Sequence, residues 1–471
     1  MQTIKTTATT VGRLSRRAFL KHTGCAAGAL LAGRAALGAD KPGKPHVVLL
    51  LVDDLGWGEV KYRRHIFETP HIDRLASEGM TFTDAYASSP TCSPSRVSII
   101  TGQHPARIRM VRHIPSPRGD GRCKEEFHTL GKDPARMPSR NWLPLGVPTL
   151  ATALKRQGYR TAFVGKWHLG HEPYHPIHHG YDAQFGVSNF GHPRSYHAPF
   201  FGPASETYAN VPKGKYLTDQ LTDDAVQYIR SQDGTKPFLL TLFYYAAHDP
   251  FQGRKDLVEK LRKAHPEKRE WQIVFAAMIA ALDESVGRIR EALRSKGFGS
   301  NTVIFFVGDQ GGKIPNGPLK GTKKGGQALY EGGARIPFHV CWPGAVRPQS
   351  TSEQLVVTTD IFPTILELAG GQPADYPKLD GQSLRTVLTG RGTLDRKEII
   401  LYRSYEDQYA AIRSGRWKLI AYRSGRRELF DLEKDLSEKN DLSAVRSEKV
   451  KELTASLHAW EKRMGVPGTL A

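Results

Sequence analysis

Cysteine is scarce in this sequence, with only four cysteines among 471 residues. They stand at positions Cys25, Cys92, Cys123 and Cys341. Cys25 lies in the basic N-terminal segment and Cys92 in a motif described below, so only Cys123 and Cys341 could form an intrachain pair. The sequence therefore excludes a disulfide framework as the main source of stability and leaves one bridge open.

Long apolar runs are also missing. Beyond residue 39 no stretch is long enough to cross a bilayer, and no nucleic-acid-binding module is recognisable. We therefore expect no membrane segment in the mature chain and no nucleic acid partner. The 67 Lys and Arg outnumber the 47 Asp and Glu, which gives a net charge of +20, and +14 without the six basic residues of 1–39. This imbalance favours an anionic partner.

Residues 1–39 contain no acidic side chain and have the pattern of an export signal. Arg16 and Arg17 precede a short apolar run that is interrupted by another arginine and is a poor membrane span. This arrangement is typical of a twin-arginine signal peptide, and small residues predict cleavage near Gly38. Lipidation of the cysteine in the run is the alternative. We expect export by the twin-arginine machinery to the periplasm or the medium.

Two apolar runs of strand length are each followed by oxygen-bearing side chains. Residues 46–52 are followed directly by Asp53-Asp54, and residues 301–307 are followed, after Gly308, by Asp309-Gln310. Continuously apolar runs are typical of strands that are buried on both faces of a mainly parallel sheet, where sites lie beyond the carboxyl ends of the strands. The pattern predicts an α/β fold. A helix or turn cap is the alternative role for an isolated Asp in such a position.

The segment Cys92–Gly102 carries the most specific signal. It reads Cys-Ser-Pro-Ser-Arg and runs on to Thr-Gly. On the residues alone, a small buried cysteine at a helix start is the alternative. The segment resembles the active site of type I sulfatases, in the alkaline phosphatase superfamily. In that family a formylglycine-generating enzyme reads the Pro and Arg and oxidises the cysteine to an aldehyde before folding.

The resemblance covers nearly all of the mature chain and implies its fold. We expect a large mixed, mainly parallel sheet sandwiched by helices, followed by a small C-terminal antiparallel sheet-and-helix subdomain. The implied domains are a signal peptide at 1–39, a catalytic domain at 40–390 and the small subdomain at 391–471. Residues 103–148 read as long loops on the pocket rim or as a solvated connector.

The resemblance also implies roles for individual residues. Arg96 is expected to hold the hydrated form of residue 92, and His248 to protonate the leaving alcohol. Lys166 and His168 are expected to contact the sulfate and the formylglycine hydroxyl. Two residues apart on an extended segment, they are predicted to point to the same side.

Two further assignments follow from the same comparison of motifs. Lys323 is expected to grip the sulfate, although the longer spacing to the next Glu-Gly-Gly leaves Lys324 as an alternative. One calcium ion is expected, because hard oxygen ligands suit it better than a soft metal. Its implied ligands are Asp53, Asp54, Asp309 and Gln310. Relatives more often have Asn or His at the position of Gln310.

The resemblance implies hydrolysis of a sulfate ester. The aldehyde is hydrated, one hydroxyl attacks sulfur as the alcohol departs, and the other is deprotonated so that sulfate is expelled. The charge and the export signal suggest a sulfated carbohydrate as the substrate. Two alternatives remain at this point, namely a phosphonate or phosphate diester hydrolase of the same superfamily and a catalytically silent protein that binds sulfated glycans.

Overall fold

The structure is a computed structural model. It describes residues 43–60, 67–115, 122–131, 133–202, 205 and 207–468. The predicted signal peptide at 1–39, with its cleavage site and Cys25, lies outside the described residues. None of the helices in the described ranges combines the length and apolarity that crossing a membrane requires.

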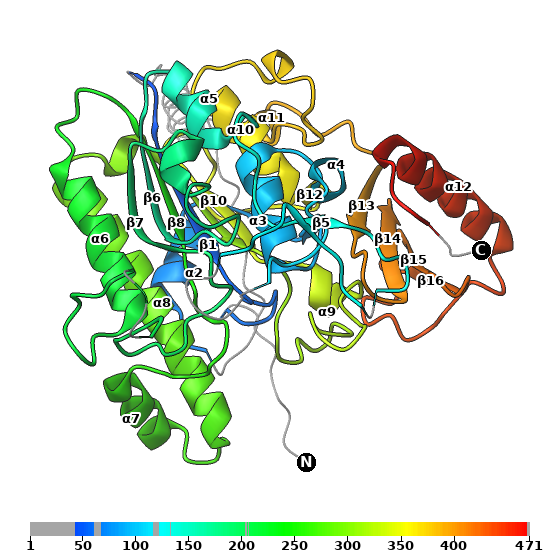
Figure 1. Cartoon of the computed structure of the whole chain (residues 1–471), viewed down its shortest axis with the longest axis horizontal. Coiled ribbons are helices and arrows are strands. Elements are labelled where there is room, and N and C mark those ends of the chain that lie inside the picture. Colours follow the sequence, from blue (N-terminus) through cyan, green and yellow to red (C-terminus); the bar gives the residue numbers. More distant parts are fainter. Residues whose placement is uncertain are drawn as a thin grey trace, which may run out of the picture. The chain divides into compact units, whose positions relative to one another are not determined.

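An eight-stranded sheet lies at the centre of the fold, in the order β11-β2-β10-β9-β1-β8-β6-β7 (Figure 1). The run from β9 to β7 is parallel, β10 is antiparallel to both of its neighbours, and β11 pairs parallel with β2. The strands are β1 (His46–Val52), β2 (Met80–Phe82), β6 (Arg160–Lys166), β7 (Ala183–Ser188), β8 (Phe238–Phe243), β9 (Thr302–Gly308), β10 (Phe338–Cys341) and β11 (Ser350–Ser352).

Helices cover both faces of this sheet, which explains why β1 is apolar throughout. Val48, Leu50 and Val52 belong to one core cluster, and the alternating Val47, Leu49 and Leu51 belong to the other. The first core includes side chains from α2 (Pro70–Ser77), α6 (Leu217–Ser231), α7 (Lys255–Ala264) and α8 (Glu270–Ser295). The second includes side chains from α3 (Cys92–Thr101), α5 (Leu150–Arg156), α10 (Ile361–Leu368) and α11 (Arg385–Leu388).

The C-terminal part forms a second, antiparallel sheet. Its strands are β13 (Glu398–Tyr402), β14 (Gln408–Ser414), β15 (Trp417–Tyr422) and β16 (Arg427–Asp431), in that order. Side chains of α12 (Ser447–Met464), including Leu457 and Trp460, share a core with one face of this sheet. The other face packs against Tyr86 and Leu329. The predicted fold class is confirmed, and the boundary between 390 and 391 stays a prediction.

Short elements complete the chain. The region 103–148 is mostly irregular, as predicted, and contains only the helix α4 (Pro105–Ile108) and the strand pair of β4 (Phe127–His128) with β5 (Ser139–Arg140) in its described part. A further pair joins β3 (Ala85–Tyr86) to β12 (Val356–Val357), and α9 is a single turn at Glu331–Ala334.

The disulfide left open by the sequence does not form. Cys123 and Cys341 are both free thiols in the structure. The Sγ of Cys123 lies 3.7 Å from the carbonyl oxygen of Pro115, and that of Cys341 lies 3.6 Å from the carbonyl oxygen of Glu78. Cys341 is buried at the end of β10, so packing alone accounts for it.

Candidate active site

Four neighbouring parallel strands, β9, β1, β8 and β6, end at the same edge of the sheet. Because ligands bind beyond the carboxyl ends of such strands, the residues there are candidates for chemistry. The strand ends carry the predicted site residues Asp53 and Asp54 after β1, Lys166 at the end of β6 with His168 beyond it, His248 after β8, and Asp309 and Gln310 after β9.

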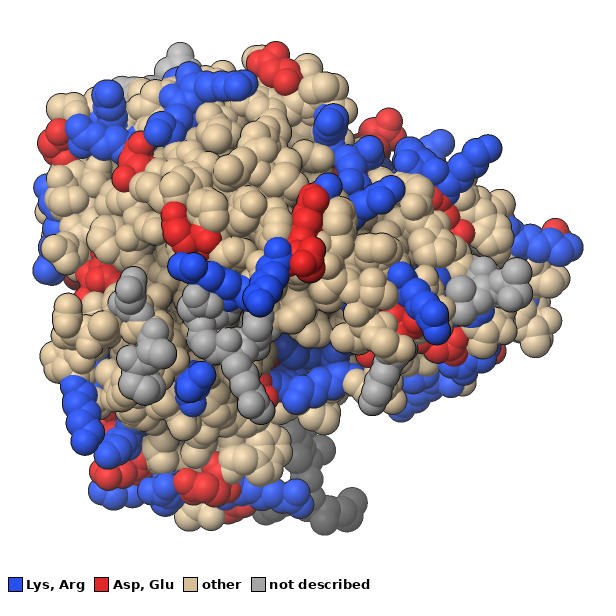
Figure 2. Space-filling model, in the orientation of Figure 1, with Lys and Arg blue, Asp and Glu red and all other residues tan. Residues whose placement is uncertain are grey.

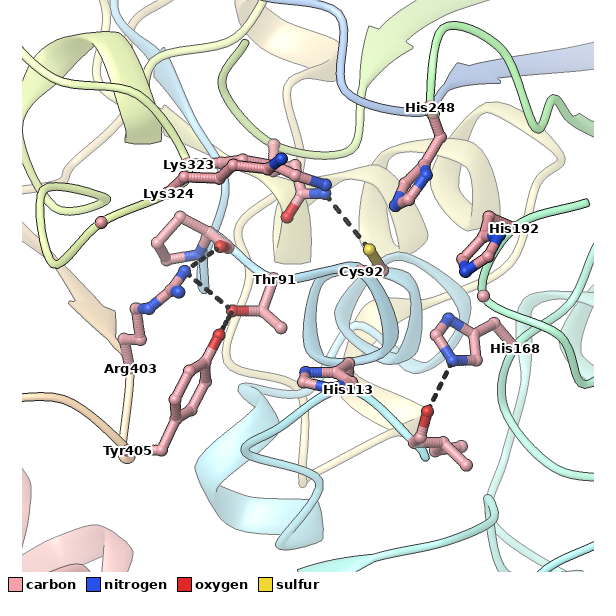
Figure 3. A pocket seen from close by; sticks show the side chains of 15 residues that line it. Thr91, Cys92, His113, His168, His192, His248, Lys323, Lys324, Arg403 and Tyr405 are labelled. Carbon is pink, nitrogen blue, oxygen red and sulfur yellow. Dashed lines mark hydrogen bonds between the residues drawn. The ribbon is translucent and has the colours of Figure 1, made fainter. Parts of the chain in front are cut away.

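Cys92 is the first residue of α3, and all ten residues of this helix are buried. Its Sγ lies 4.0 Å from Oδ1 of Asp53 and 3.3 Å from Nε2 of Gln310. The thiol lines a cavity of about 540 Å³ (Figure 3). Burial raises the pKa of this thiol, but the ammonium groups of Lys166 and Lys323, together with the rings of His168 and His248, outweigh burial and hold the pKa well below its ordinary value. The site therefore stabilises negative charge at position 92.

Buried cations and carboxylates surround the floor of this cavity. Lys166 forms an ion pair with Asp53. Arg96 donates from Nη2 to Oδ2 of Asp309 at 3.1 Å and from Nη1 to the carbonyl oxygen of Lys166 at 2.8 Å. The guanidinium also lies 3.4 Å from Oδ2 of Asp53, and none of these side chains is exposed. Arg96 thus joins α3 to the ends of β1, β6 and β9.

The carboxylates fit the expected cation. Burial, and after it the neighbouring Asp53, raise the pKa of Asp309 well above its ordinary value. Oδ2 of Asp54 is buried without a hydrogen-bond partner among the described residues. Gln310 donates to Oδ1 of Asp54 at 2.6 Å, and rotating the amide by half a turn would present its oxygen instead. Four hard oxygen donors of this kind suit calcium.

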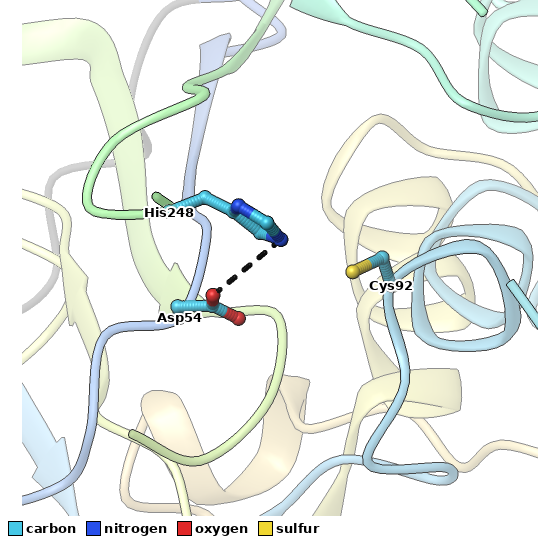
Figure 4. A group of neighbouring side chains, drawn as sticks. All are labelled: Asp54, Cys92 and His248. Carbon is cyan, nitrogen blue, oxygen red and sulfur yellow. Dashed lines mark ion pairs between the residues drawn. The ribbon is translucent and has the colours of Figure 1, made fainter. Parts of the chain in front are cut away.

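His248 faces these carboxylates. Its Nε2 lies 3.7 Å from Oδ2 of Asp54, and Figure 4 shows the ring of His248 above Asp54 and opposite Cys92. Burial lowers the pKa of His248, but the charge of Asp54 and the hydrogen bonds to Asp249 and Cys92 together outweigh it, and the pKa is raised to about 9. The imidazole is therefore protonated at neutral pH in this arrangement.

The predicted alignment of Lys166 and His168 on one extended segment is wrong. Strand β6 ends at Lys166, and His168 has a φ of 52°, which lies in the left-handed region. The chain turns after the strand, and this turn brings His168 to the cavity wall. The ring packs so closely on Gly191 that a Cβ there would lie 2.8 Å from Cε1 of His168.

The two candidate lysines occupy different places. Lys323 is largely buried and forms an ion pair with Asp54. Lys324 is exposed and lines the same cavity. The structure therefore brings Lys323 into the buried cluster and leaves Lys324 on the rim.

Several lining residues were not found from the sequence. His192 stacks on His248 with ring centroids 5.4 Å apart and an interplanar angle of 10°. Arg403 and Tyr405 reach the cavity from the C-terminal sheet, and His113 from the region after α4 (Figure 3). No local pattern marks these residues, because tertiary packing alone brings their segments to the cavity.

Asp249 and Lys313 extend the cluster behind His248. Nδ1 of His248 lies 2.6 Å from Oδ1 of Asp249, and the same carboxylate forms an ion pair with Lys313. The adjacent His-Asp pair was visible in the sequence, and Lys313 follows shortly after Asp309 and Gln310. This geometry turns Nε2 of His248 toward Asp54 and the cavity.

Comparison with known proteins agrees with this geometry. Residues 45–371 match the family model described as Sulfatase, and residues 326–464 match the model described as N-sulphoglucosamine sulphohydrolase, C-terminal. The chain is 31% identical over 416 residues to N-acetylgalactosamine-6-sulfatase of Rattus norvegicus, covering 81% of this chain and 72% of that protein. It is 29% identical over 409 residues to arylsulfatase G of Mus musculus, covering 76% of this chain and 72% of that protein.

A solved structure shares the fold of this chain. The crystal structure of Ps i-CgsB in complex with k-i-k-neocarrahexaose superposes with a TM-score of 0.76 and 28% sequence identity, covering 88% of this chain and 92% of that one. The resemblance noted in the sequence is thereby confirmed. With a family model matched across the whole central sheet and a cysteine-centred site at the strand ends, the chain belongs to the sulfatase family of sulfuric ester hydrolases.

Proposed function

We propose that this sulfatase is exported and removes sulfate from a sulfated carbohydrate, using a formylglycine made from Cys92 and one calcium ion. The observation that carries the proposal is the position of Cys92. Its thiol lies between the buried carboxylates and the cavity, and Lys166 and Lys323 lower its pKa.

The proposed conversion of Cys92 gives the site its nucleophile. The hydrated aldehyde supplies an oxygen that attacks sulfur and afterwards releases sulfate, whereas a serine would be left as a stable sulfate ester. Arg96, bound to Asp309 and to the carbonyl oxygen of Lys166, fixes the first turns of α3 against the strand ends. It therefore restricts where residue 92 can sit.

The two histidines suit opposite proton transfers. With a pKa of about 9, His248 carries a proton that it can give to the leaving alcohol. Burial lowers the pKa of His168, so this ring is neutral at pH 7. Its Nε2 lies 2.9 Å from the carbonyl oxygen of Ile114, which places the proton on Nε2 and leaves Nδ1 as a buried acceptor without a hydrogen-bond partner among the described residues. We assign proton donation to His248 and proton acceptance to His168.

The metal and the lysines would share the anionic charge. Asp53, Asp54, Asp309 and Gln310 would hold calcium, which when bound offsets the charge on the sulfate oxygens. Lys166 and Lys323, which pair with Asp53 and Asp54 in the structure, would then be available to the sulfate. Each lysine would stabilise the charge that develops on the sulfate as the ester bond breaks.

A carbohydrate substrate is supported by the relatives and by the cavity. One relative is named for N-acetylgalactosamine 6-sulfate, and the structural relative was solved with a neocarrahexaose bound. A volume of about 540 Å³ has room for a sugar unit beyond the sulfate, and polar side chains such as His113, His192 and Tyr405 line it. The positive charge of the chain favours an anionic ligand of this kind.

Export is proposed from residues 1–39 alone, with their paired arginines and apolar run. The twin-arginine route carries folded proteins, so formylglycine and calcium would be in place before transport. Fractionation of cells that express the chain with and without the Arg16→Lys and Arg17→Lys changes tests this part. Unchanged appearance of both chains in the periplasm or the medium would contradict it.

The chemistry is tested by two measurements on protein expressed with a formylglycine-generating enzyme. Mass spectrometry of the peptide that contains Cys92 should show the loss of mass expected for thiol-to-aldehyde conversion. The same protein should release sulfate from sulfated sugars, and the Cys92→Ala variant should release none. Hydrolysis of phosphate diesters with no release of sulfate would favour the related phosphohydrolase activity, and unmodified Cys92 in an active protein would refute the proposed nucleophile.

A further inference from the structure

The charges that line the cavity are strongly one-sided. None of the described residues that line it is Asp or Glu, whereas Lys323, Lys324 and Arg403 all do so. Figure 2 shows Lys and Arg side chains scattered over one face of the molecule, with acidic side chains among them. Selection of a particular anion therefore depends on the cavity and not on a single basic stripe of this face.

Of the three Lys and Arg side chains that line the cavity, two already have partners. Lys323 pairs with Asp54 and is assigned above to the reacting sulfate. Arg403 is buried, donates from Nη1 to the carbonyl oxygen of Pro90 at 2.8 Å, and lies 3.0 Å from Oε1 of Glu406. These contacts make Arg403 a support for the segment that precedes Cys92.

Lys324 is the cation that is left over. It lines the cavity, its side chain is exposed, and it forms no ion pair with any residue in the described ranges. It is followed by Gly325 and Gly326, which both have a φ of 70° and open space where a Cβ would stand. Glycine is favoured there by the backbone conformation and not by crowding, so the turn that presents Lys324 at the rim depends on these two residues.

Tyr405 supplies a hydroxyl in the same part of the cavity. In Figure 3, Lys324, Arg403 and Tyr405 lie on one side of Cys92, and His168, His192 and His248 lie on the other. The Tyr405 ring lies under the Arg403 guanidinium at 4.5 Å, and its hydroxyl is 3.4 Å from Oγ1 of Thr91. This long contact leaves the hydroxyl able to donate to a ligand.

We propose that Lys324 and Tyr405 form a subsite for a second anionic group on the sugar, beside the sulfate that is removed. The pocket then selects saccharides with two anionic groups over those with one sulfate. The inference rests on the proposed function, because that function assigns Lys323 to the reacting sulfate. The ligand chemistry is a sulfate or carboxylate oxygen that accepts from an ammonium and a phenol.

The test measures binding, so that it does not depend on turnover. The full chain with the Cys92→Ala change, in calcium-containing buffer, is titrated calorimetrically with pairs of sugars that differ by one anionic group. Monosulfated and disulfated N-acetylgalactosamine, galactose and glucosamine form the first pairs. Monosulfated disaccharides with and without a uronate form the second set. In at least one pair the doubly anionic sugar should bind about tenfold more tightly, as one charge-assisted hydrogen bond provides.

Variants of the same protein then show whether Lys324 and Tyr405 cause the preference for the doubly anionic sugar. Adding Lys324→Gln should abolish it, Lys324→Arg should keep it, and Tyr405→Phe should reduce it. Lys263→Gln, which removes an equal charge from an exposed position of α7, is the matched control and should keep the preference. A gain confined to disulfated sugars identifies sulfate as the second group, and a gain with uronate identifies carboxylate.

Equal affinities within every pair, or a preference that survives Lys324→Gln, would overturn the proposal. Failure of the proposed function is seen separately, as absence of sulfate release from any sugar or aryl sulfate by the protein that retains Cys92. Melting temperatures of all variants are measured alongside, so that a variant that does not fold is recognised. If Lys324→Gln does not fold, the affinities of Lys324→Arg and Tyr405→Phe for the paired sugars test the proposal.

Discussion

Lys418 Nζ lies 2.7 Å from Oε1 of Glu331, and both side chains are completely buried. Lys418 belongs to β15 of the C-terminal sheet, whereas Glu331 opens α9, which follows the segment that carries Lys323 and Lys324. The same ammonium lies 2.9 Å from Oε1 of Glu438. This ion cluster therefore joins the C-terminal sheet to the segment that delivers two lysines to the cavity.

Removing the cation should be severely destabilising. Lys418→Met leaves Glu331 and Glu438 buried without their shared partner, and we expect a loss of about 3–5 kcal/mol in the free energy of unfolding. Urea denaturation measures it. Lys449→Met, which breaks the exposed pair with Glu452, is the matched control and should cost under about 1 kcal/mol. Equal losses in the two variants would show that the buried ion cluster stabilises the fold no more than an exposed ion pair does.

Calcium should stabilise the folded protein. Chelation should lower the melting temperature and abolish sulfate release, and calcium at a hundred times its Kd should restore about 2.7 kcal/mol. Because Gln310 touches Asp54, Gln310→Ala should weaken calcium affinity by at least about tenfold. Gln327→Ala, an exposed change in the nearby segment, should leave it unaltered. Full recovery with zinc but not with calcium would contradict the proposed metal.

Loss of His248 should matter most for poor leaving groups. His248→Gln should lower kcat for a sugar sulfate by about 10²–10⁴-fold, because an alkoxide must then depart without a proton. The loss should be much smaller for 4-nitrophenyl sulfate, whose phenolate leaves unaided. Steady-state kinetics on both substrates checks this, with the exposed His458→Gln as the control. An equal loss on both substrates would remove His248 from the role of proton donor.

Stability should fall as the solution is acidified below pH 6.5. Burial lowers the pKa of His46 and of His104 to about 4, and Nδ1 of each ring accepts a backbone N–H, from Phe238 and Ala106 respectively. In the unfolded chain the pKa of histidine is about 6.5. Between these values the unfolded state binds protons that the folded state does not, so stability is complete above pH 6.5 and is lost progressively toward pH 4.

The acid dependence is checked by urea denaturation at a series of pH values. His104→Gln keeps an acceptor but does not titrate, so the slope of unfolding free energy against pH between 4 and 6.5 should become shallower. The exposed His458→Gln should leave the slope unchanged. A slope that is identical in both variants would refute the role of His104.

The parts of the site that could be predicted are those with a local signal. Strand β1 and the pair Asp53-Asp54 follow from a continuous apolar run, and the motif beginning at Cys92 carries its own spacing. The turn that gives His168 its positive φ could not be predicted, since histidine tolerates a positive φ but adopts it only in a minority of positions. The sequence therefore identified Lys166 and His168 as site residues but did not predict the turn between them.

Other parts depend on which distant segments meet. Lys324 and Tyr405 line one cavity although the C-terminal sheet provides only the second of them. Packing of that sheet on Tyr86 and Leu329, which the sequence pattern does not encode locally, brings Tyr405 there. The different positions of Lys323, which is largely buried beside Asp54, and Lys324, which is exposed, likewise depend on tertiary packing. The spacing of the motif did not show which lysine would be buried.

Because every residue of α3 is buried in the folded protein, the proposed oxidation of Cys92 has to take place before folding is complete. Once the sheet has closed over this helix, no enzyme could grasp Cys92, Pro94 and Arg96 together, so the proposed oxidation competes in time with folding. A fold rich in long-range parallel pairing forms slowly, which lengthens the interval for modification. Variants or temperatures that accelerate folding should therefore yield a larger share of unconverted, inactive molecules from the same gene.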